Sequence, residues 1–151
     1  MMTAGLCYLD LPKIPDHIIQ GLNRDFSQYH HDDSKVTGSK QINTYTNSFN
    51  KQINDWCQKN ISQSLYWGFM IMHRDLGPHV DVGTKLKLTC LIDPGGDQVR
   101  TDFFADDKIT VLQSVIIEPG RWHLFRSDMT HAVTGIEPGK TRFSTTASIF
   151  R

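Results

Sequence analysis

From Leu65 to the end, the sequence consists of short strand-like runs separated by turn residues. The separators contain Pro-Gly, Gly-Gly and Asp, as in "DPGGDQ" and "EPGK". Short strands at regular spacing with such turns are typical of an antiparallel sandwich or barrel. The runs that we expect to be strands span residues 65–74, 85–92, 99–104, 109–118, 122–127, 131–136 and 141–150.

The first 64 residues have a different pattern, and it predicts helices and one strand. The run "GLCYLDL" alternates and is expected to form a strand. Apolar side chains recur every four residues over 14–26, which predicts an amphipathic helix, and residues 48–61 predict a second one. Polar residues 30–46 lie between the helices and are expected to form a lid loop. The apolar stripes consist of Ile14, Ile18, Leu22 and Phe26, and of Phe49, Ile53, Trp56, Cys57 and Ile61.

These patterns predict one domain over 1–151, in which 65–150 form the barrel core. We expect a mostly β fold of the jelly-roll or cupin-like type, with two helices packed on one outer face. The last strand supports this arrangement because it is two-faced. Its apolar face can pack under the helices, and its polar face then lines a wet pocket, unless the strand lies at the surface. The polar residues are Arg142, Ser144, Thr146 and Ser148; the apolar ones are Phe143, Ala147 and Ile149.

The composition of the chain limits the classes of partner and the cellular location that we expect. The 16 Lys and Arg residues balance the 16 Asp and Glu residues, so nucleic acid is not an expected partner. No apolar run is long enough to span a bilayer, and the start of the chain does not resemble a signal peptide. The three cysteines form no CxxC motif, which favours a reducing compartment, and we expect a cytoplasmic protein. No oligomeric state follows from the sequence.

The stretch "GPHVDVG" places His79 and Asp81 two residues apart in a turn. In extended backbone these side chains share a face, so both can reach one point. His131 opens another strand-like run directly after the turn "SDMT". Two imidazoles and one carboxylate leave coordination positions open on an octahedral ion, and this set suits Fe(II). The other histidines (His17, His30, His31, His73 and His123) are interpreted as surface, loop or structural residues.

Arg142 follows His131 by eleven residues, beyond the turn "EPGK". We expect it on the neighbouring strand, with its guanidinium pointing into the same cavity. A guanidinium binds a carboxylate through two parallel hydrogen bonds, and Ser144 on the same face can donate another. A metal with a carboxylate anchor beyond it is a site that a short dicarboxylate would fill.

These motifs resemble those of the Fe(II)/2-oxoglutarate-dependent oxygenases, which have a double-stranded β-helix fold. The matching segments are "HVD" at 79–81, "THAV" at 130–133 and "GKTRFS" at 139–144. The closing run is most similar to prolyl-hydroxylase-type members, and the resemblance covers about residues 65 to 150.

The resemblance implies that His79, Asp81 and His131 bind Fe(II). It further implies that Arg142 and Ser144 bind the distal carboxylate of 2-oxoglutarate and that Thr89 lines the co-substrate pocket. Such an enzyme uses O2, in some cases with ascorbate, and releases succinate and CO2. It would hydroxylate a C–H bond of an amino acid, of a peptidyl residue such as proline, or of a small metabolite.

Two other readings stay open at this point. A cupin-type metal enzyme would lack 2-oxoglutarate and use Arg142 to anchor its substrate's own carboxylate. A jelly-roll binding or structural protein would not be catalytic. No co-substrate contact can be assigned from sequence within residues 66–73, where related enzymes often supply a tyrosine.

Overall fold

A computed structural model describes residues 5–25, 42–46 and 51–149, and of residues 42–46 it describes the backbone alone. None of the helices in these segments is long and apolar enough to cross a membrane. The elements are β1 (Leu6–Tyr8), α1 (Asp16–Gln20), β2 (Ile42–Thr46), α2 (Lys51–Asn60), β3 (Trp67–Met72), β4 (Leu76–His79), β5 (Leu86–Asp93), β6 (Arg100–Phe104), β7 (Val111–Val115), β8 (Trp122–Arg126), β9 (His131–Thr134) and β10 (Arg142–Ile149).

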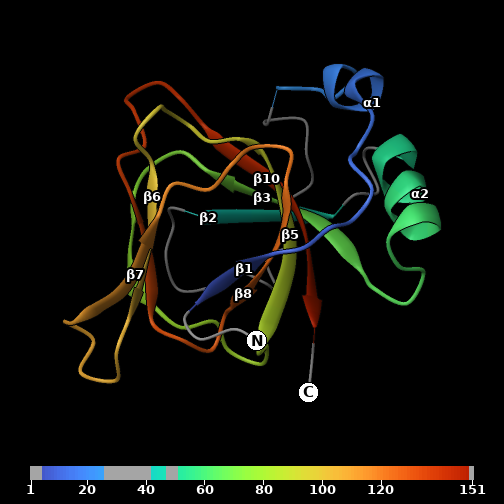
Figure 1. The fold of residues 1–151 in the computed structure, drawn as a ribbon. Helices are drawn as coiled ribbons and strands as arrows, with labels where there is room; N and C mark the ends of the chain where they lie inside the picture. Colours follow the sequence, from blue (N-terminus) through green and yellow to red (C-terminus); the bar gives the residue numbers. More distant parts are fainter. Residues whose placement is uncertain (1–4, 26–41, 47–50, 150–151) are drawn as a thin grey trace.

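The strands form two antiparallel sheets that enclose a barrel interior (Figure 1). The six-stranded sheet has the order β1-β8-β5-β10-β3-β2, and the four-stranded sheet has the order β4-β9-β6-β7. From β3 onward the chain crosses between the sheets at nearly every connection, which is the jelly-roll pattern. The predicted double-stranded β-helix is confirmed.

Both helices lie on the side of the six-stranded sheet that faces away from the four-stranded sheet (Figure 1). Ile18 of α1 and Ile53 and Cys57 of α2 are buried in one apolar cluster with the outward-facing side chains of this sheet. Burial of each large apolar side chain contributes about 1.5–3 kcal/mol. The expected packing of the apolar face of β10 is confirmed, because Phe143 and Ala147 belong to this cluster.

The first helix is shorter than predicted. It covers Asp16–Gln20 rather than 14–26, beginning after Pro15 and ending at Gly21. Glycine has poor helix propensity, so the helix is not favoured to continue past Gly21. Ile14 and Leu22 lie outside the helix but are still buried in the cluster, so the apolar spacing marks the buried face rather than the helix length. Phe26 and Phe49 are outside the described residues.

The prediction of a loop over 30–46 is wrong for its last part. Ile42–Thr46 form β2, which pairs with β3 at the edge of the six-stranded sheet. The segment "INTYT" is rich in β-branched and aromatic residues, and these favour extended backbone. The lid assigned to residues 30–41 lies outside the described residues and stays a prediction.

The segment before Asp81 is a strand and not only a turn. β4 is an edge strand of the four-stranded sheet, where Pro78 is tolerated because one side needs no ladder hydrogen bond. Its pairing with β9 shifts register between Leu76 and His79. The shift places His79 directly opposite His131.

The placement of Arg142 on a strand adjacent to His131 is wrong. β9 belongs to the four-stranded sheet and β10 to the six-stranded sheet, where β10 pairs with β3 and β5. Residues 135–141 therefore cross between the sheets instead of forming a hairpin. The crossing begins at Gly135, whose φ is +90° and where a Cβ atom would lie 2.8 Å from the carbonyl oxygen of Gln98. His131 and Arg142 thus lie on opposite sheets of the barrel, and both are buried.

Candidate metal and co-substrate site

The three candidate metal ligands come together at one end of the barrel. His79 ends β4, Asp81 lies in the turn that follows, and His131 begins β9. Nε2 of His79 lies 3.3 Å from Oδ1 of Asp81, and Nε2 of His131 lies 4.0 Å from Oδ2. One donor atom from each residue lies within 4.8 Å of the others, so one ion can bind all three.

Backbone carbonyls orient both imidazoles. Nδ1 of His79 lies 2.9 Å from the carbonyl oxygen of Gly77, and Nδ1 of His131 lies 2.7 Å from that of Met129. Because a carbonyl oxygen can only accept, each Nδ1 must donate its proton. In the neutral ring the lone pair is therefore left on Nε2, which lies toward Asp81, and only a protonated His79 donates from Nε2 to the carboxylate. This arrangement fixes the tautomer that a histidine needs to bind a metal.

The electrostatics of the three residues favour a bound cation. Burial disfavours the Asp81 carboxylate, but the hydrogen bond with His79 and the charge of Lys87 outweigh it, and the pKa of Asp81 is lowered. Burial lowers the pKa of His131, so this imidazole is readily neutral. For His79, the opposing effect of the Asp81 hydrogen bond outweighs burial and raises the pKa. The carboxylate is thus ionised and available to a metal.

Lys87 was not identified from the sequence as part of the site. Its Nζ lies 2.7 Å from Oδ2 of Asp81, and its side chain is 12% exposed. A signal was present in "KLKLT", because Lys87 alternates with Leu86 and Leu88 and shares a face with Thr89. Since Thr89 was expected to line the pocket, Lys87 should have been expected there too.

Ser127 joins the metal loop to the turn before His131. Its carbonyl oxygen accepts a hydrogen bond from the Asp81 amide at 2.8 Å, and its own amide donates to Lys85 at 3.0 Å. Its hydroxyl lies 2.7 Å from that of Thr84, and the residue is fully buried. No sequence pattern indicates this role, because "SDMT" has the composition of an ordinary turn. Ser127 holds Asp81 in place relative to β9.

Arg142 is buried and contacts neutral groups. Its Nη1 donates to the carbonyl oxygen of Pro94 at 3.2 Å, and Nη2 donates to the hydroxyl of Thr101 at 3.3 Å. Within the described part of the chain, no carboxylate forms an ion pair with it. Burial lowers its pKa to about 10, so the guanidinium is still charged at neutral pH. A buried charge without a counterion is costly, and an anionic ligand would compensate it.

Ser144 and Thr89 both lie on the inner face of the six-stranded sheet. Ser144 is two residues from Arg142 on β10 and is 7% exposed. The hydroxyl of Thr89 lies 2.8 Å from that of Thr146. Ser144 therefore shares the inner face of β10 with Arg142, whereas Thr89 lies on β5 opposite Thr146, and the hydroxyls of these two threonines contact each other.

His123 also faces the interior, from β8 opposite Thr89. Nδ1 lies 3.4 Å from the carbonyl oxygen of Arg121, consistent with a hydrogen-bonded structural residue. Burial lowers its pKa to about 4, and the nearby charge of Arg142 acts in the same direction. This imidazole is neutral at physiological pH and adds no charge to the interior.

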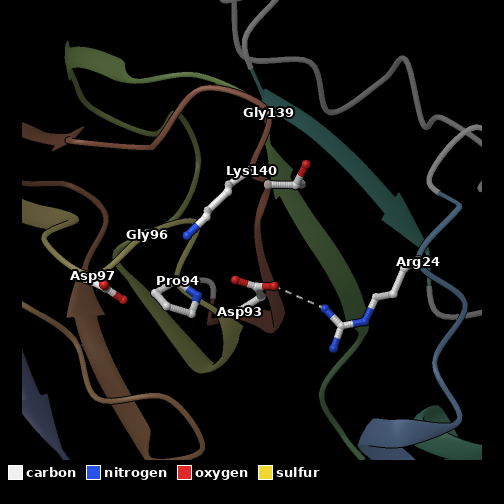
Figure 2. A pocket seen from close by; sticks show the side chains of 8 residues that line it. Arg24, Asp93, Pro94, Gly96, Asp97, Gly139 and Lys140 are labelled. Atoms are coloured by element: carbon white, nitrogen blue, oxygen red, sulfur yellow. Dashed lines mark ion pairs between the residues drawn. The ribbon is translucent and has the colours of Figure 1, made fainter.

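A surface hollow of about 430 Å³ lies near the start of β10 (Figure 2). None of the three metal-ligand candidates lines it. Arg24 and Asp93 form an ion pair of 3.5 Å in it, and both side chains are about half exposed. Its charges already compensate each other, and none of the residues that line it is a candidate ligand. The lining residues are Arg24, Asp93, Pro94, Gly96, Asp97, Gly139, Lys140 and Thr141.

Known structures with a similar fold include oxygenases of the type that the motifs suggested. A prolyl-4-hydroxylase from Pseudomonas putida superposes with a TM-score of 0.58 at 15% identity, covering 99% of this chain and 94% of that one. The fold is that of the 2-oxoglutarate oxygenases. A prolyl hydroxylase from Trichoplax adhaerens, solved with a peptide of the hypoxia-inducible factor, gives a TM-score of 0.60 at 13% identity and covers 98% and 84%.

HygX from Streptomyces hygroscopicus, solved with nickel, 2-oxoglutarate and hygromycin B, gives a TM-score of 0.56 at 9% identity and covers 97% and 82%. No protein-family model matches the sequence, and no curated protein matches it. At these identities the likeness establishes the fold. It agrees with the resemblance seen in the motifs, and the grouping of His79, Asp81 and His131 agrees with it independently.

Proposed function

We propose that this protein is an Fe(II)- and 2-oxoglutarate-dependent oxygenase. The observation that carries the proposal is the pairing of two sites in one interior. His79, Asp81 and His131 converge on one point, and Arg142 lies deeper with a buried charge that no described carboxylate compensates. A ligand that bridges these sites must bind a metal at one end and carry a negative charge at the other.

The donor set supports iron as the metal. Two imidazoles and one carboxylate bind one face of an octahedral ion and leave the other positions for co-substrate and O2. Cys57 and Cys90 are buried in the barrel wall toward the helices, so neither thiol is in this donor set. Bound iron would supply the redox chemistry, and the protein would supply position and a dry surrounding.

The register of the four-stranded sheet supports 2-oxoglutarate as the bridging ligand. Phe103 of β6 lies opposite His131, and Thr101 lies opposite Val133. Thr101, which binds Arg142, is therefore two residues deeper than the metal ligand, a rise of about 6–7 Å. A five-carbon dicarboxylate that chelates the metal through one end can reach the guanidinium with the other. Arg142 and Ser144 would bind that distal carboxylate.

For the reaction, we propose hydroxylation of a C–H bond of an amino acid, a peptidyl residue or a small metabolite, with release of succinate and CO2. The likeness to prolyl hydroxylases in fold is one support for an amino-acid or peptidyl substrate. We also propose a cytoplasmic location, since Cys57 and Cys90 are buried and free, and burial raises the pKa of both thiols to about 12. Such thiols are inert and need no oxidising compartment.

The test is the visible spectrum of the protein with Fe(II) and 2-oxoglutarate under anaerobic conditions. Chelation of iron by the keto acid should produce a charge-transfer band, and this band should be absent with succinate, which lacks the keto group. On admission of O2, slow uncoupled turnover should release succinate from 2-oxoglutarate. Iron binding without the band would instead favour a cupin-type enzyme that uses no keto acid.

A further inference from the structure

We propose that Lys87 binds a carboxylate of the primary substrate beside the metal, so that the substrate is a free small acid rather than an internal residue of a peptide. This inference rests on the proposed oxygenase function and specifies its substrate class. It starts from the position of Lys87, which lies on the inner face of β5 at the metal end of the barrel.

The ammonium group of Lys87 has donors to spare. One contact is made to Oδ2 of Asp81 at 2.7 Å, and no second acceptor for Nζ is found among the described residues. An ammonium carries three N–H donors, so two of them are available to a ligand. Because the side chain is 12% exposed, solvent can satisfy these donors only in part.

A count of charges gives the sign of that ligand. Among the described groups that face the interior, Asp81 is negative, while Lys87 and Arg142 are positive. His123 is neutral, and Asp102 alternates with the inward-facing Thr101 and Phe103 and so points to the other face of its sheet. A divalent metal and the two carboxylates of 2-oxoglutarate cancel each other. The loaded interior therefore keeps one positive charge in excess.

The excess charge lies at the metal end. Arg142 would be compensated by the distal carboxylate of the co-substrate, and Asp81 would share its charge between the metal and Lys87. An uncompensated charge in a closed interior is unfavourable, and one further carboxylate would remove it. A substrate carboxylate on Lys87 would also fix the orientation of the neighbouring C–H bond relative to the metal, because a charge-assisted hydrogen bond is directional.

The experiment uses the protein loaded with saturating Fe(II) and 2-oxoglutarate without O2. The probes are the standard free L-amino acids and short hydroxy acids, each paired with its neutral carboxamide. Binding next to the metal is measured as a change in the charge-transfer band during titration. At least one acid should bind about 10- to 100-fold more tightly than its amide, the preference expected of a partly buried charged hydrogen bond.

Two substitutions assign that preference to Lys87. Lys87→Met keeps the length of the side chain without its charge and should reduce the acid-to-amide ratio to near one, whereas Lys87→Arg should keep a preference for the acid. Lys85→Met is the matched control, because Lys85 is exposed two residues away, and its ratio should equal that of the wild type.

The inference is overturned if amides bind as well as acids, if no acid in the panel changes the band, or if Lys87→Met keeps the wild-type ratio. Failure of the oxygenase proposal looks different, since the band would then be missing before any probe is added. Loss of the Lys87 contact with Asp81 could weaken metal binding in Lys87→Met. Because the acid-to-amide ratio is measured at saturating metal, such a loss does not affect it.

Discussion

The two ends of the barrel interior bind charge in opposite ways. At the metal end, the Asp81 carboxylate lies between His79 and Lys87, and the protein supplies its own counter-charges. At the deep end, Arg142 contacts the Pro94 carbonyl and the Thr101 hydroxyl, which are neutral. The first end is folded around an anion that belongs to the chain, and the second around a cation whose partner must come from outside. The difference predicts that substitutions at the two ends will separate metal binding from co-substrate binding.

The largest effect is expected at the metal end. His79→Ala or His131→Ala should abolish Fe(II) binding, because two remaining ligands do not hold the ion against water. The measurement is iron stoichiometry after anaerobic loading and desalting. His17→Ala, which removes an exposed histidine from α1, is the control and should retain wild-type iron. Wild-type stoichiometry in both site variants would disprove the assignment.

The second largest effect is expected at the deep end of the interior, where Arg142 lies. Arg142→Ala would leave the distal carboxylate of 2-oxoglutarate buried without a partner, at a cost of about 3–5 kcal/mol. This corresponds to a loss of affinity of roughly two to four decades. Titration of the charge-transfer band measures it, and iron stoichiometry should be unchanged. Arg142→Lys should recover part of the affinity, because lysine keeps the charge without the planar fork.

Unchanged 2-oxoglutarate affinity in Arg142→Ala would show that the arginine serves another ligand. Arg126→Ala is the control for a lost surface arginine, since Arg126 is paired with Asp128 and is partly exposed. It should bind both iron and 2-oxoglutarate like the wild type.

A smaller effect tests how Arg142 is held. Thr101→Val removes the hydroxyl that accepts from Nη2 but keeps the volume of the side chain. Loss of one hydrogen bond to a charged group should weaken 2-oxoglutarate binding about tenfold, without altering iron binding. Thr134→Val, at an exposed position of the adjacent strand, is the matched control. If both variants bind equally well, the hydroxyl does not position the guanidinium.

The smallest effect concerns stability rather than binding. The pKa of His123 falls from 6.5 to about 4 in the folded protein because the imidazole is buried. Between these pH values the unfolded chain binds a proton that the folded chain does not. The free energy of unfolding should therefore decrease as pH falls through this window, by roughly 1 kcal/mol per pH unit.

Urea unfolding at several pH values measures this slope. His123→Gln should flatten it, whereas His17→Gln, at an exposed histidine, should leave it unchanged. A slope that is the same in all three proteins would mean that His123 does not contribute to the acid sensitivity.

Short strand-like runs separated by turn residues were enough to predict a sandwich or barrel. The two-faced pattern of β10 predicted which side chains point inward, because successive side chains of a strand point to opposite faces of the sheet. The number of residues between two motifs was less informative about how the strands that carry them are connected. Eleven residues separate His131 from Arg142, and the same length fits a hairpin or a crossing between sheets, so the crossing could not be read from it.

Contacts that depend on tertiary structure could not be predicted from the sequence either. Ser127 acts through backbone atoms and one hydroxyl, and no sequence pattern marks such a role. The short length of α1 was missed because apolar spacing reports burial, and Ile14 and Leu22 are buried without being helical. Lys87 differs from these, since its alternation with Leu86 and Leu88 is visible in the sequence and places it on the same face as Thr89.

The turn that holds the Arg142 guanidinium has a consequence for how relatives of this protein can be found. At Gly95, φ is +79°, and a Cβ atom there would lie 2.9 Å from the backbone nitrogen of Arg142. Any other residue would push against the strand that carries the guanidinium. Gly139 also has a positive φ, but a Cβ atom there would meet nothing within 4 Å. A sequence search that requires only the three metal ligands and an arginine would admit many unrelated chains. Requiring glycine at the position of Gly95, and allowing Asn or Asp at that of Gly139, would select those chains in which the arginine is seated in the same way.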